Sequence, residues 1–385
     1  MNSKRKLSLL ILFIISNVLS YADVVVNNIH YNVTDTINNE VEVTYASEYG
    51  DQSEYLSGII SIPSEITIDD VIYKVTSIGK RALYGCKNLT SITLSEGIIS
   101  IGENAFDGCD NLKTVNLPSS LRIIDKNAFC YCDNLETVHL PDSLTTINDY
   151  AFYSCTRLTS ISIPKTVTFF GESVFYGCRS LNSVIIPAGW KRINNDTFHG
   201  CTNLTTINIP DSITSIGYHA FHDCYKLEKI TLPEGITTIE EGAFCFCGLK
   251  SIVFPKSLRI IGNGVFSECK SLETVFFPDS METIDNGAFY ECQNLLTVKL
   301  PDSVNTLGKE IFRNCKKLEK ITFPKYVKSL GTGILEGCTN LVSVSFPDNM
   351  KSVPKEMFSS CTNLKTIVIP NGVISIGKGA FYDCM

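Results

Sequence analysis

The cysteines of this chain recur at one period, and that period restricts the fold more than any other feature. Fourteen of the sixteen cysteines are spaced 23 residues apart, except for one 22-residue step from Cys247 to Cys269. A repeat of this length is too short to bury its own apolar face, so each unit must stack on its neighbours. The period therefore predicts a solenoid. Gly248 lies in the short repeat, and its backbone freedom is expected to let that loop close one residue early.

One repeat, residues 112–134, shows how each unit is built. In its first half Val115 and Leu117 alternate with polar residues, which is the pattern of a short strand that buries one face. Pro118 ends this strand because proline has no amide hydrogen to donate to a sheet. A shorter extended piece follows the proline. We expect the apolar positions of the repeat to form the core: Leu112, Val115, Leu117, Leu121, Ile124 and Phe129.

The second half of the repeat returns the chain to the next strand. Ala128, Phe129 and Cys132 have the spacing of a single helical turn with one inward side. The predicted fold is therefore an α/β repeat, a right-handed solenoid with a parallel β-sheet on one wall and short helical turns on the other. Neighbouring strands of such a sheet lie about 4.8 Å apart.

The repeat also has a recognisable signature. The pattern Leu-x-x-Ile-x-Leu-Pro-x-x-Leu-x-x-Ile-Gly-x-x-Ala-Phe-x-x-Cys resembles the BspA-like family of leucine-rich-repeat surface proteins, and the resemblance runs from about Ile60 to Cys384. It implies a leucine-rich-repeat fold and adhesion to extracellular-matrix proteins or to other cells. One departure from the wider superfamily is that Ser, Thr or Gly, as in Ser120 and Thr166, stands where a buried Asn is usual.

The ends of the chain differ from the array. Residues 1–22 have the basic start, apolar stretch and small residues of a signal peptide; a membrane anchor is the alternative, but the apolar stretch is short for a bilayer. Residues 23–58 contain β-rich runs, which we interpret as an N-terminal cap rather than an independent binding domain. Residues 59–385 are assigned to the solenoid, with a degenerate first repeat, thirteen clear strands and an incomplete last unit.

Charge and hydropathy restrict the partners of the exported chain. Removal of the leader takes the formal charge from −7 to −10, because it removes three basic residues and no acidic one. An acidic chain without a basic stripe argues against binding nucleic acid. No second apolar run follows, so we expect a secreted or cell-surface protein without a membrane span in its mature chain. The last strand, residues 364–369, would leave an open edge that favours end-to-end self-association.

The cysteines themselves allow two interpretations. In an exported protein they suggest disulfides, but side chains stacked in parallel on successive rungs point the same way, which is poor geometry for that bond. We therefore expect a ladder of buried thiols, with local pairing as the alternative. Cys130 and Cys245 fall outside the ladder, and each forms a Cys-x-Cys pair that suggests zinc. Because five rungs separate them, we expect them instead to replace outward-facing tyrosines.

Three histidines form the one candidate metal site. His199 and His222 hold the same repeat position on neighbouring rungs, and His219 precedes His222 by three residues. Together they would place three imidazoles on one patch of the wall opposite the strands. The simpler interpretation is that they are solvated surface residues, so the sequence predicts neither a metal nor a cofactor.

The sequence shows no nucleotide-binding, nucleophile or zinc-protease motif, so we do not expect an enzyme. Outward strand positions form columns along the sheet, one nearly uniform in Ser and Thr and its neighbour varied. The function we predict is protein recognition or adhesion through the sheet face; the alternative is a structural surface-layer or spacer protein. Candidate partner-binding residues in the varied column are Ile185, Asn208, Thr231, Val253, Phe276 and Lys299.

Overall fold

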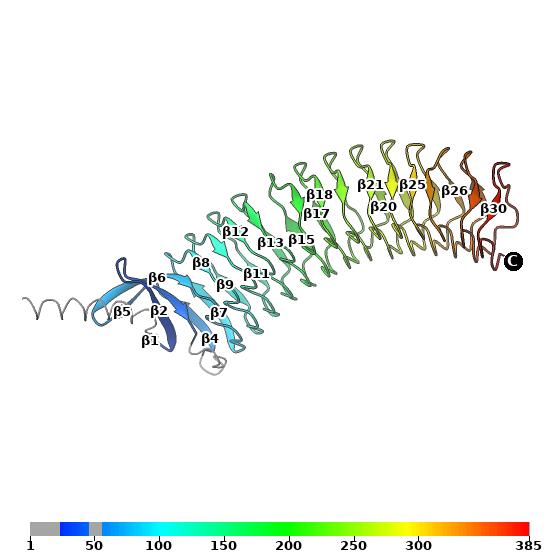
Figure 1. Cartoon of the computed structure of the whole chain (residues 1–385). Helices are drawn as coiled ribbons and strands as arrows, with labels where there is room; N and C mark the ends of the chain where they lie inside the picture. Colours follow the sequence, from blue (N-terminus) through cyan, green and yellow to red (C-terminus); the bar gives the residue numbers. More distant parts are fainter. Residues whose placement is uncertain (1–23, 46–55, 385) are drawn as a thin grey trace, which may run out of the picture. The chain divides into compact units, whose positions relative to one another are not determined.

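The computed structural model describes residues 24–45 and 56–384. The chain divides into a first compact unit that ends at Val174 and a second that begins at Phe175. Each unit is a parallel β-solenoid in which successive repeats form successive rungs (Figure 1). The predicted signal peptide, residues 1–22, lies outside the described residues.

In the first unit every full repeat contributes to two parallel sheets rather than one. The first sheet is built from the strands that precede each proline: β4 (Gly58–Ile62), β7 (Leu89–Leu94), β9 (Thr114–Asn116), β11 (Thr137–Val138) and β13 (Ser160–Ser162). The second sheet is built from the short extended pieces after the proline: β8 (Ser100–Ile101), β10 (Ile123–Ile124), β12 (Thr146–Ile147) and β14 (Phe169–Phe170). Equivalent residues pair in both, as Thr137 pairs with Thr114 and Ile124 with Ile101.

The residues before the array extend its second sheet. The β-rich runs form β1 (Val24–Val26), β2 (Ile29–Asp35) and β3 (Glu40–Thr44), which pair antiparallel in that order. Strand β3 then pairs in parallel with β6 (Val71–Ile78), which continues to β8. A hairpin of β5 (Glu65–Ile68) with β6 was not predicted. We propose that β1–β3 act as the cap, because they cover the edge that β6 would otherwise expose.

The second unit has the same two sheets, but its first sheet is divided. The strands of this first sheet fall into three groups: β15 (Ser183–Ile185) with β17 (Thr206–Asn208), β20 (Ser251–Val253) with β22 (Thr274–Phe276), and β24 (Thr297–Lys299) with β26 (Lys320–Thr322) and β28 (Ser343–Ser345). The second sheet contains β16 (Arg192–Ile193), β18 (Ser215–Ile216), β19 (Thr238–Ile239), β21 (Ile260–Ile261), β23 (Thr283–Ile284), β25 (Thr306–Leu307) and β27 (Ser329–Leu330). A last pair joins β29 (Ser352–Val353) to β30 (Ser375–Ile376).

Two expected strands of the first sheet, residues 229–231 and 366–368, are not formed. At the second of these the predicted edge strand is absent, and the last described turn exposes Val368 and Ile374 instead. Backbone hydrogen bonds of these short strands come only from neighbouring rungs, so a rung that is poorly paired loses its strand. End-to-end association through this face stays a prediction.

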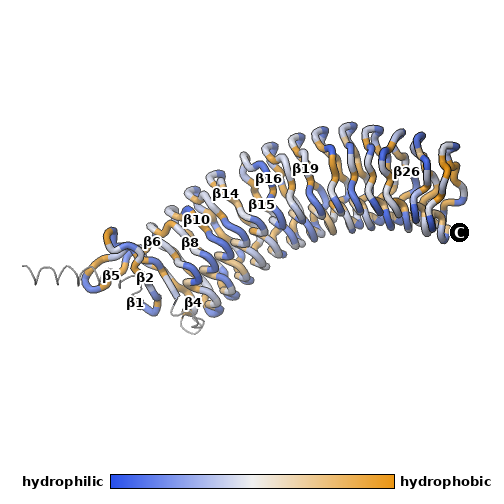
Figure 2. The backbone as a smooth tube through the Cα atoms, viewed as in Figure 1, coloured by the Kyte–Doolittle hydropathy of each residue, from blue (hydrophilic) through white to orange (hydrophobic). Residues whose placement is uncertain are grey.

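The core is a column of stacked side chains inside the rungs. Figure 2 shows apolar stretches recurring at matching places from one rung to the next. In the repeat analysed above Leu112, Val115, Leu121, Ile124 and Phe129 are buried as predicted, while Leu117 is only half-buried. The phenylalanines form a stack: ring centroids of Phe106 and Phe129 lie 5.0 Å apart with nearly parallel planes.

The predicted helical turns are wrong. All regular elements among the described residues are strands, and the third wall of each rung is made of turns. Along this turn wall successive backbone amides alternate between donating to the next rung and donating within their own rung. Phe129 donates to Ala151 of the next rung at 2.8 Å, whereas the following amide, of Cys130, donates to Asn127 of its own rung at 3.1 Å. Asn127 and Tyr131 have φ angles of 55° and 54°, which a right-handed helix does not contain.

The cysteine ladder has a role beyond filling space. The thiol of Cys132 donates to the carbonyl oxygen of Phe106 on the preceding rung at 3.2 Å, and Cys224 donates to Phe198 at 3.3 Å. Each carbonyl oxygen also accepts a backbone amide of its own rung, as that of Phe106 does from Cys109 at 3.1 Å, so the thiol supplies a second hydrogen bond to it. A cysteine fits because it is nearly apolar yet carries a weak donor. Periodicity alone showed the size of this side chain but not its hydrogen bond.

Cys130 and Cys245 do not point outward as expected. Both are buried, and burial raises the pKa of each thiol to about 12. No disulfide joins any of the sixteen cysteines, all of which lie among the described residues; fifteen of them are buried, whereas Cys384 is partly exposed. The accessible thiol is therefore at the last described turn.

We expect a thiol-specific reagent at neutral pH to react much faster with Cys384 than with the other cysteines of the native protein, because the others are shielded from it. Partial burial also raises the pKa of Cys384, so exposure rather than ionisation makes the difference. The other cysteines should react only on addition of denaturant. Thiol titration followed by peptide mass spectrometry measures this directly. A Cys384→Ser variant should lose the rapid phase, and rapid labelling at several ladder positions would contradict the buried-thiol assignment.

Candidate functional site

The predicted partner-binding column lies on the first sheet of the second unit. All six residues are exposed at its surface. Val253 and Phe276 are register partners in β20 and β22, so their side chains lie side by side, and they are 62% and 58% exposed. Ile185 pairs with Asn208 and is 64% exposed. Large apolar side chains exposed in register on a sheet are typical of a binding surface rather than of a solvated one.

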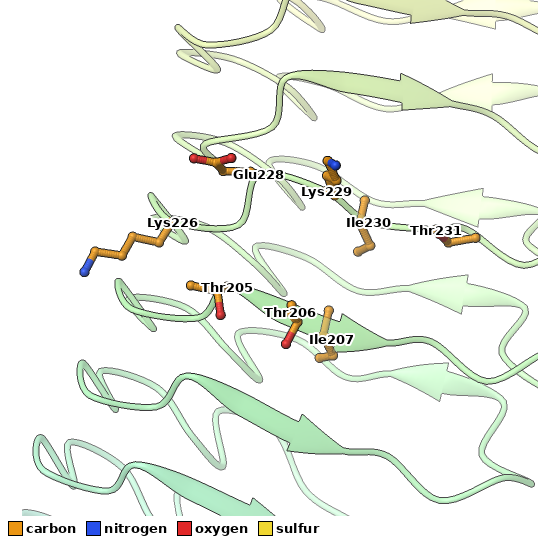
Figure 3. Close-up of a pocket in the computed structure, with 8 residues that line it drawn as sticks. All are labelled: Thr205, Thr206, Ile207, Lys226, Glu228, Lys229, Ile230 and Thr231. Atoms are coloured by element: carbon orange, nitrogen blue, oxygen red, sulfur yellow. The ribbon is translucent and has the colours of Figure 1, made fainter.

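A groove interrupts this column at Thr231. Residues 228–231 run as an irregular segment beside β17, and the space between the two rungs has a volume of about 450 Å³ (Figure 3). Ile207 and Ile230, whose equivalent Val115 is buried, are both partly exposed here. The rest of the lining comes from Lys226, Glu228, Lys229 and the threonines of both rungs. The groove therefore joins an apolar floor to a charged and hydroxylated rim.

Sequence reasoning did not find this groove. Lys229, Ile230 and Thr231 match the strand positions of their siblings, so the pattern predicts a strand that the structure lacks. Charge gives no signal either, because the same four residues, Glu-Lys-Ile-Thr, recur at 319–322, where Lys320–Thr322 form strand β26.

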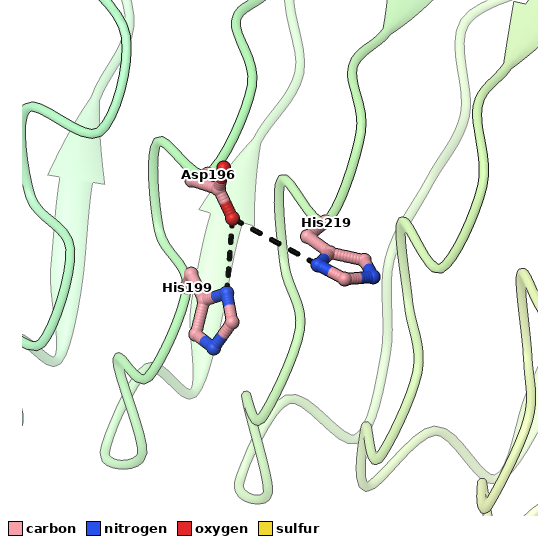
Figure 4. Close-up of side chains that lie close together, drawn as sticks. All are labelled: Asp196, His199 and His219. Carbon is pink, nitrogen blue, oxygen red and sulfur yellow. Dashed lines mark hydrogen bonds and ion pairs between the residues drawn. The ribbon is translucent and has the colours of Figure 1, made fainter.

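The three histidines meet on the turn wall of the second unit. His199 Nδ1 lies 3.0 Å from Oδ1 of Asp196, and His219 Nδ1 lies 3.9 Å from the same oxygen (Figure 4). The rings of His199 and His222 stack with centroids 4.5 Å apart. These side chains are not solvated as expected: those of His199 and His222 are 16% and 17% exposed. The predicted juxtaposition is thus present in a partly buried form.

A second carboxylate, Asp223, completes the cluster. Its Oδ2 lies 3.8 Å from Nε2 of His199 and 3.2 Å from Nδ1 of His222, while its Oδ1 accepts a hydrogen bond from the Tyr225 hydroxyl at 2.7 Å. That bond raises the pKa of Tyr225 to about 12. Burial lowers the pKa of His219 and of His222, so both rings are neutral at neutral pH.

The turns that carry these residues are held by a salt bridge across two rungs. Arg192 donates to both carboxylate oxygens of Glu240 at 2.7 Å, and also to Asn195 Oδ1 at 2.8 Å. Glu240 and Asn195 both accept the amide of Tyr218. Bidentate charge-assisted bonds of this kind fix geometry. The backbone on either side of Asp196 and His219 is therefore positioned by side chains as well as by rung pairing.

None of the described residues belongs to a helix that is long and apolar enough to cross a membrane. The two stacked parallel sheets and the turn wall define a leucine-rich-repeat β-solenoid. The family described as BspA type leucine rich repeat region (6 copies) matches residues 63–182, 189–318 and 282–385. The chain belongs to this family.

Solved structures of bacterial leucine-rich-repeat proteins are similar to this chain. A leucine-rich repeat protein from Bacteroides ovatus is 31% identical over 89% of this chain and 94% of that one, with a TM-score of 0.76. A leucine rich cell surface protein from Faecalibacterium prausnitzii is 26% identical over 95% and 93%, with a TM-score of 0.53. The pneumococcal vaccine antigen PcpA, 20% identical over 92% and 93% with a TM-score of 0.51, shares the fold. No curated protein matches the chain.

Proposed function

We propose that the protein is exported and recognises a protein partner through the first sheet of its second unit. The observation that carries the proposal is the pair Val253 and Phe276, two large apolar side chains exposed in register. Aromatic side chains dominate the binding energy of protein interfaces, and they do so beside pockets that exclude water. The groove at Thr231 adds such a hollow on the rung next to Val253, in the same column.

The partner class follows from family and surface together. Leucine-rich-repeat proteins generally bind proteins, and the similar Faecalibacterium protein is described as a cell surface protein. The partners we propose are extracellular-matrix proteins or surface proteins of neighbouring cells, with adhesion as the outcome. The acidic net charge, −7 for the full chain and −10 (30 − 40) once residues 1–22 are removed, favours a partner whose complementary surface is basic.

Binding of the purified protein to a panel of matrix proteins, with glycans included, tests this proposal. We expect a Phe276→Ser variant to bind the recognised partner about 10- to 100-fold more weakly, as loss of an interface anchor does. The matched control is Ile260→Ser, which removes an exposed isoleucine of similar exposure from β21 on the second sheet. It should bind as the unchanged protein does. No binding to any panel member would favour a structural spacer instead, and equal loss in both variants would exclude the first sheet as the interface.

A further inference from the structure

The turn-wall cluster of the second unit brings together side chains of the types that bind transition metals. One ligand atom from each of His199, His222 and Asp223 lies within 4.8 Å of the others, and a second triplet is formed by Asp196, His199 and His219. The two triplets share His199. Its Nε2 faces Asp223 of the first triplet, and its Nδ1 faces Asp196 of the second. The orientation of this ring therefore decides between them.

His199 is held in the tautomer that serves the first triplet. Its Nδ1 faces Asp196 Oδ1 at 3.0 Å, and its other nitrogen points away from that carboxylate (Figure 4). A ring that donates Nδ1–H to a carboxylate presents the lone pair of Nε2. This is the usual arrangement of a metal-bound histidine with an outer carboxylate. Nε2 of His199 is the atom that lies 3.8 Å from Asp223 Oδ2.

His222 and Asp223 complete the ligand set. His222 Nδ1 is buried and lies 3.2 Å from Asp223 Oδ2, a contact that is too poorly aligned for a full hydrogen bond. A buried ring nitrogen held by so weak a contact gains from a stronger partner. Asp223 is fixed by the Tyr225 hydroxyl on its other oxygen, so Oδ2 faces the two imidazoles. Hydrogen bonds to the far side of a ligand are what orient metal ligands in known sites.

From these contacts we propose that His199 Nε2, His222 Nδ1 and Asp223 Oδ2 bind a Zn²⁺ ion, with Asp196 as the outer carboxylate that orients His199. Two imidazoles and a carboxylate are a donor set typical of zinc, whose bonds of about 2.0–2.1 Å require ligand atoms about 3.3 Å apart in a tetrahedron. The separations of 3.2 and 3.8 Å from Asp223 are close to that value. The rings of His199 and His222 are stacked, with planes 22° apart and centroids 4.5 Å apart, so one imidazole must turn out of the stack before both lone pairs point at one ion. The fourth position is left to water or to an external donor. This site is independent of the proposed interface.

Zinc binding to the full chain tests the inference. Isothermal titration with ZnCl₂, followed by metal analysis after dialysis, should give one Zn²⁺ per chain, and EDTA should remove it. The variants His222→Ala and His222→Gln should both lower the affinity about 100-fold or more. Asp196→Asn should lower it about 10- to 100-fold, because only an outer partner is changed. Circular dichroism establishes that each variant is folded.

Two control variants separate this site from its alternatives. His219→Ala should keep the affinity within a few-fold, because His219 belongs only to the triplet that the His199 tautomer disfavours. Cys245→Ser tests whether the buried thiol of the neighbouring rung contributes, and should also leave binding unchanged. Loss of zinc in His219→Ala with binding retained in His222→Ala would overturn the assignment in favour of the other triplet. Absence of stoichiometric binding to the unchanged, folded protein would overturn the site altogether.

Discussion

Replacing Phe221 by alanine is expected to lower the free energy of unfolding by about 3–5 kcal/mol, the usual cost of removing a buried phenylalanine. Phe221 is fully buried and stacks on Phe198 and Phe244, with ring centroids 5.3 and 5.2 Å away. A rung of a solenoid contacts only its two neighbours, so no more distant element can collapse into the resulting cavity. Urea denaturation followed by circular dichroism measures the change.

Two variants show whether the stack itself carries this energy. Phe221→Leu should cost clearly less, because Leu335 occupies the equivalent position of a later rung and is also fully buried. Phe276→Ala removes the same side chain from the exposed first sheet and should change stability by no more than about 0.5 kcal/mol. If Phe221→Ala were as mild as Phe276→Ala, the phenylalanine stack would not be a main source of stability.

The sequence predicted the strands well because their determinants are local. The alternation of apolar and polar residues around Val115 and the end of the strand at Pro118 are both properties of one repeat. The period then places equivalent residues of successive repeats in register. The same period predicts that Val253 and Phe276 hold equivalent positions on neighbouring strands, and the structure pairs them in register. Where each rung pairs only with the rungs beside it, a repeating pattern is enough to fix the architecture.

The turn wall could not be predicted from the same pattern. An inward Phe129 and Cys132 suit a helical turn and an irregular turn equally, and the difference lies in the amide of Phe129, which donates to the next rung. Residues with positive φ, such as Asn127 and His219, mark the irregular turns. The enrichment of Asn, Asp and Gly at these positions is a signal that apolar periodicity ignores.

The sites depended on distances that spacing does not contain. The period places His199 beside His222, but neither the tautomer of His199 nor the approach of Asp223 follows from it. The groove arises from a failure of pairing at residues 229–231, where the pattern is intact. Candidate residues were therefore identified, while the geometry that gives them a function was not.

Replacing Gly248 by alanine is expected to destabilise the protein by about 3 kcal/mol, at the upper end of what overpacking costs. The sequence suggested that this glycine is needed for unusual backbone angles, but its φ lies outside the left-handed region. The physical reason is instead a close approach. A Cβ at this position would overlap the carbonyl oxygen of Tyr225 and lie 3.0 Å from its carbonyl carbon. The repeat that is one residue short brings two backbones together.

Gly235→Ala is the matched control, because a Cβ there meets its nearest atoms, the carbonyl oxygens of Asp211 and Ile213, at 3.5 Å, which is ordinary contact. It should be neutral or stabilise by up to about 1 kcal/mol, since alanine reduces the freedom of the unfolded chain. Hydrogen exchange should show weakened protection near Leu249 in Gly248→Ala alone, because backbone atoms cannot move aside as a flexible side chain can. Equal stability of the two variants would mean that the short loop relaxes without strain, and the shortened repeat would then need no glycine.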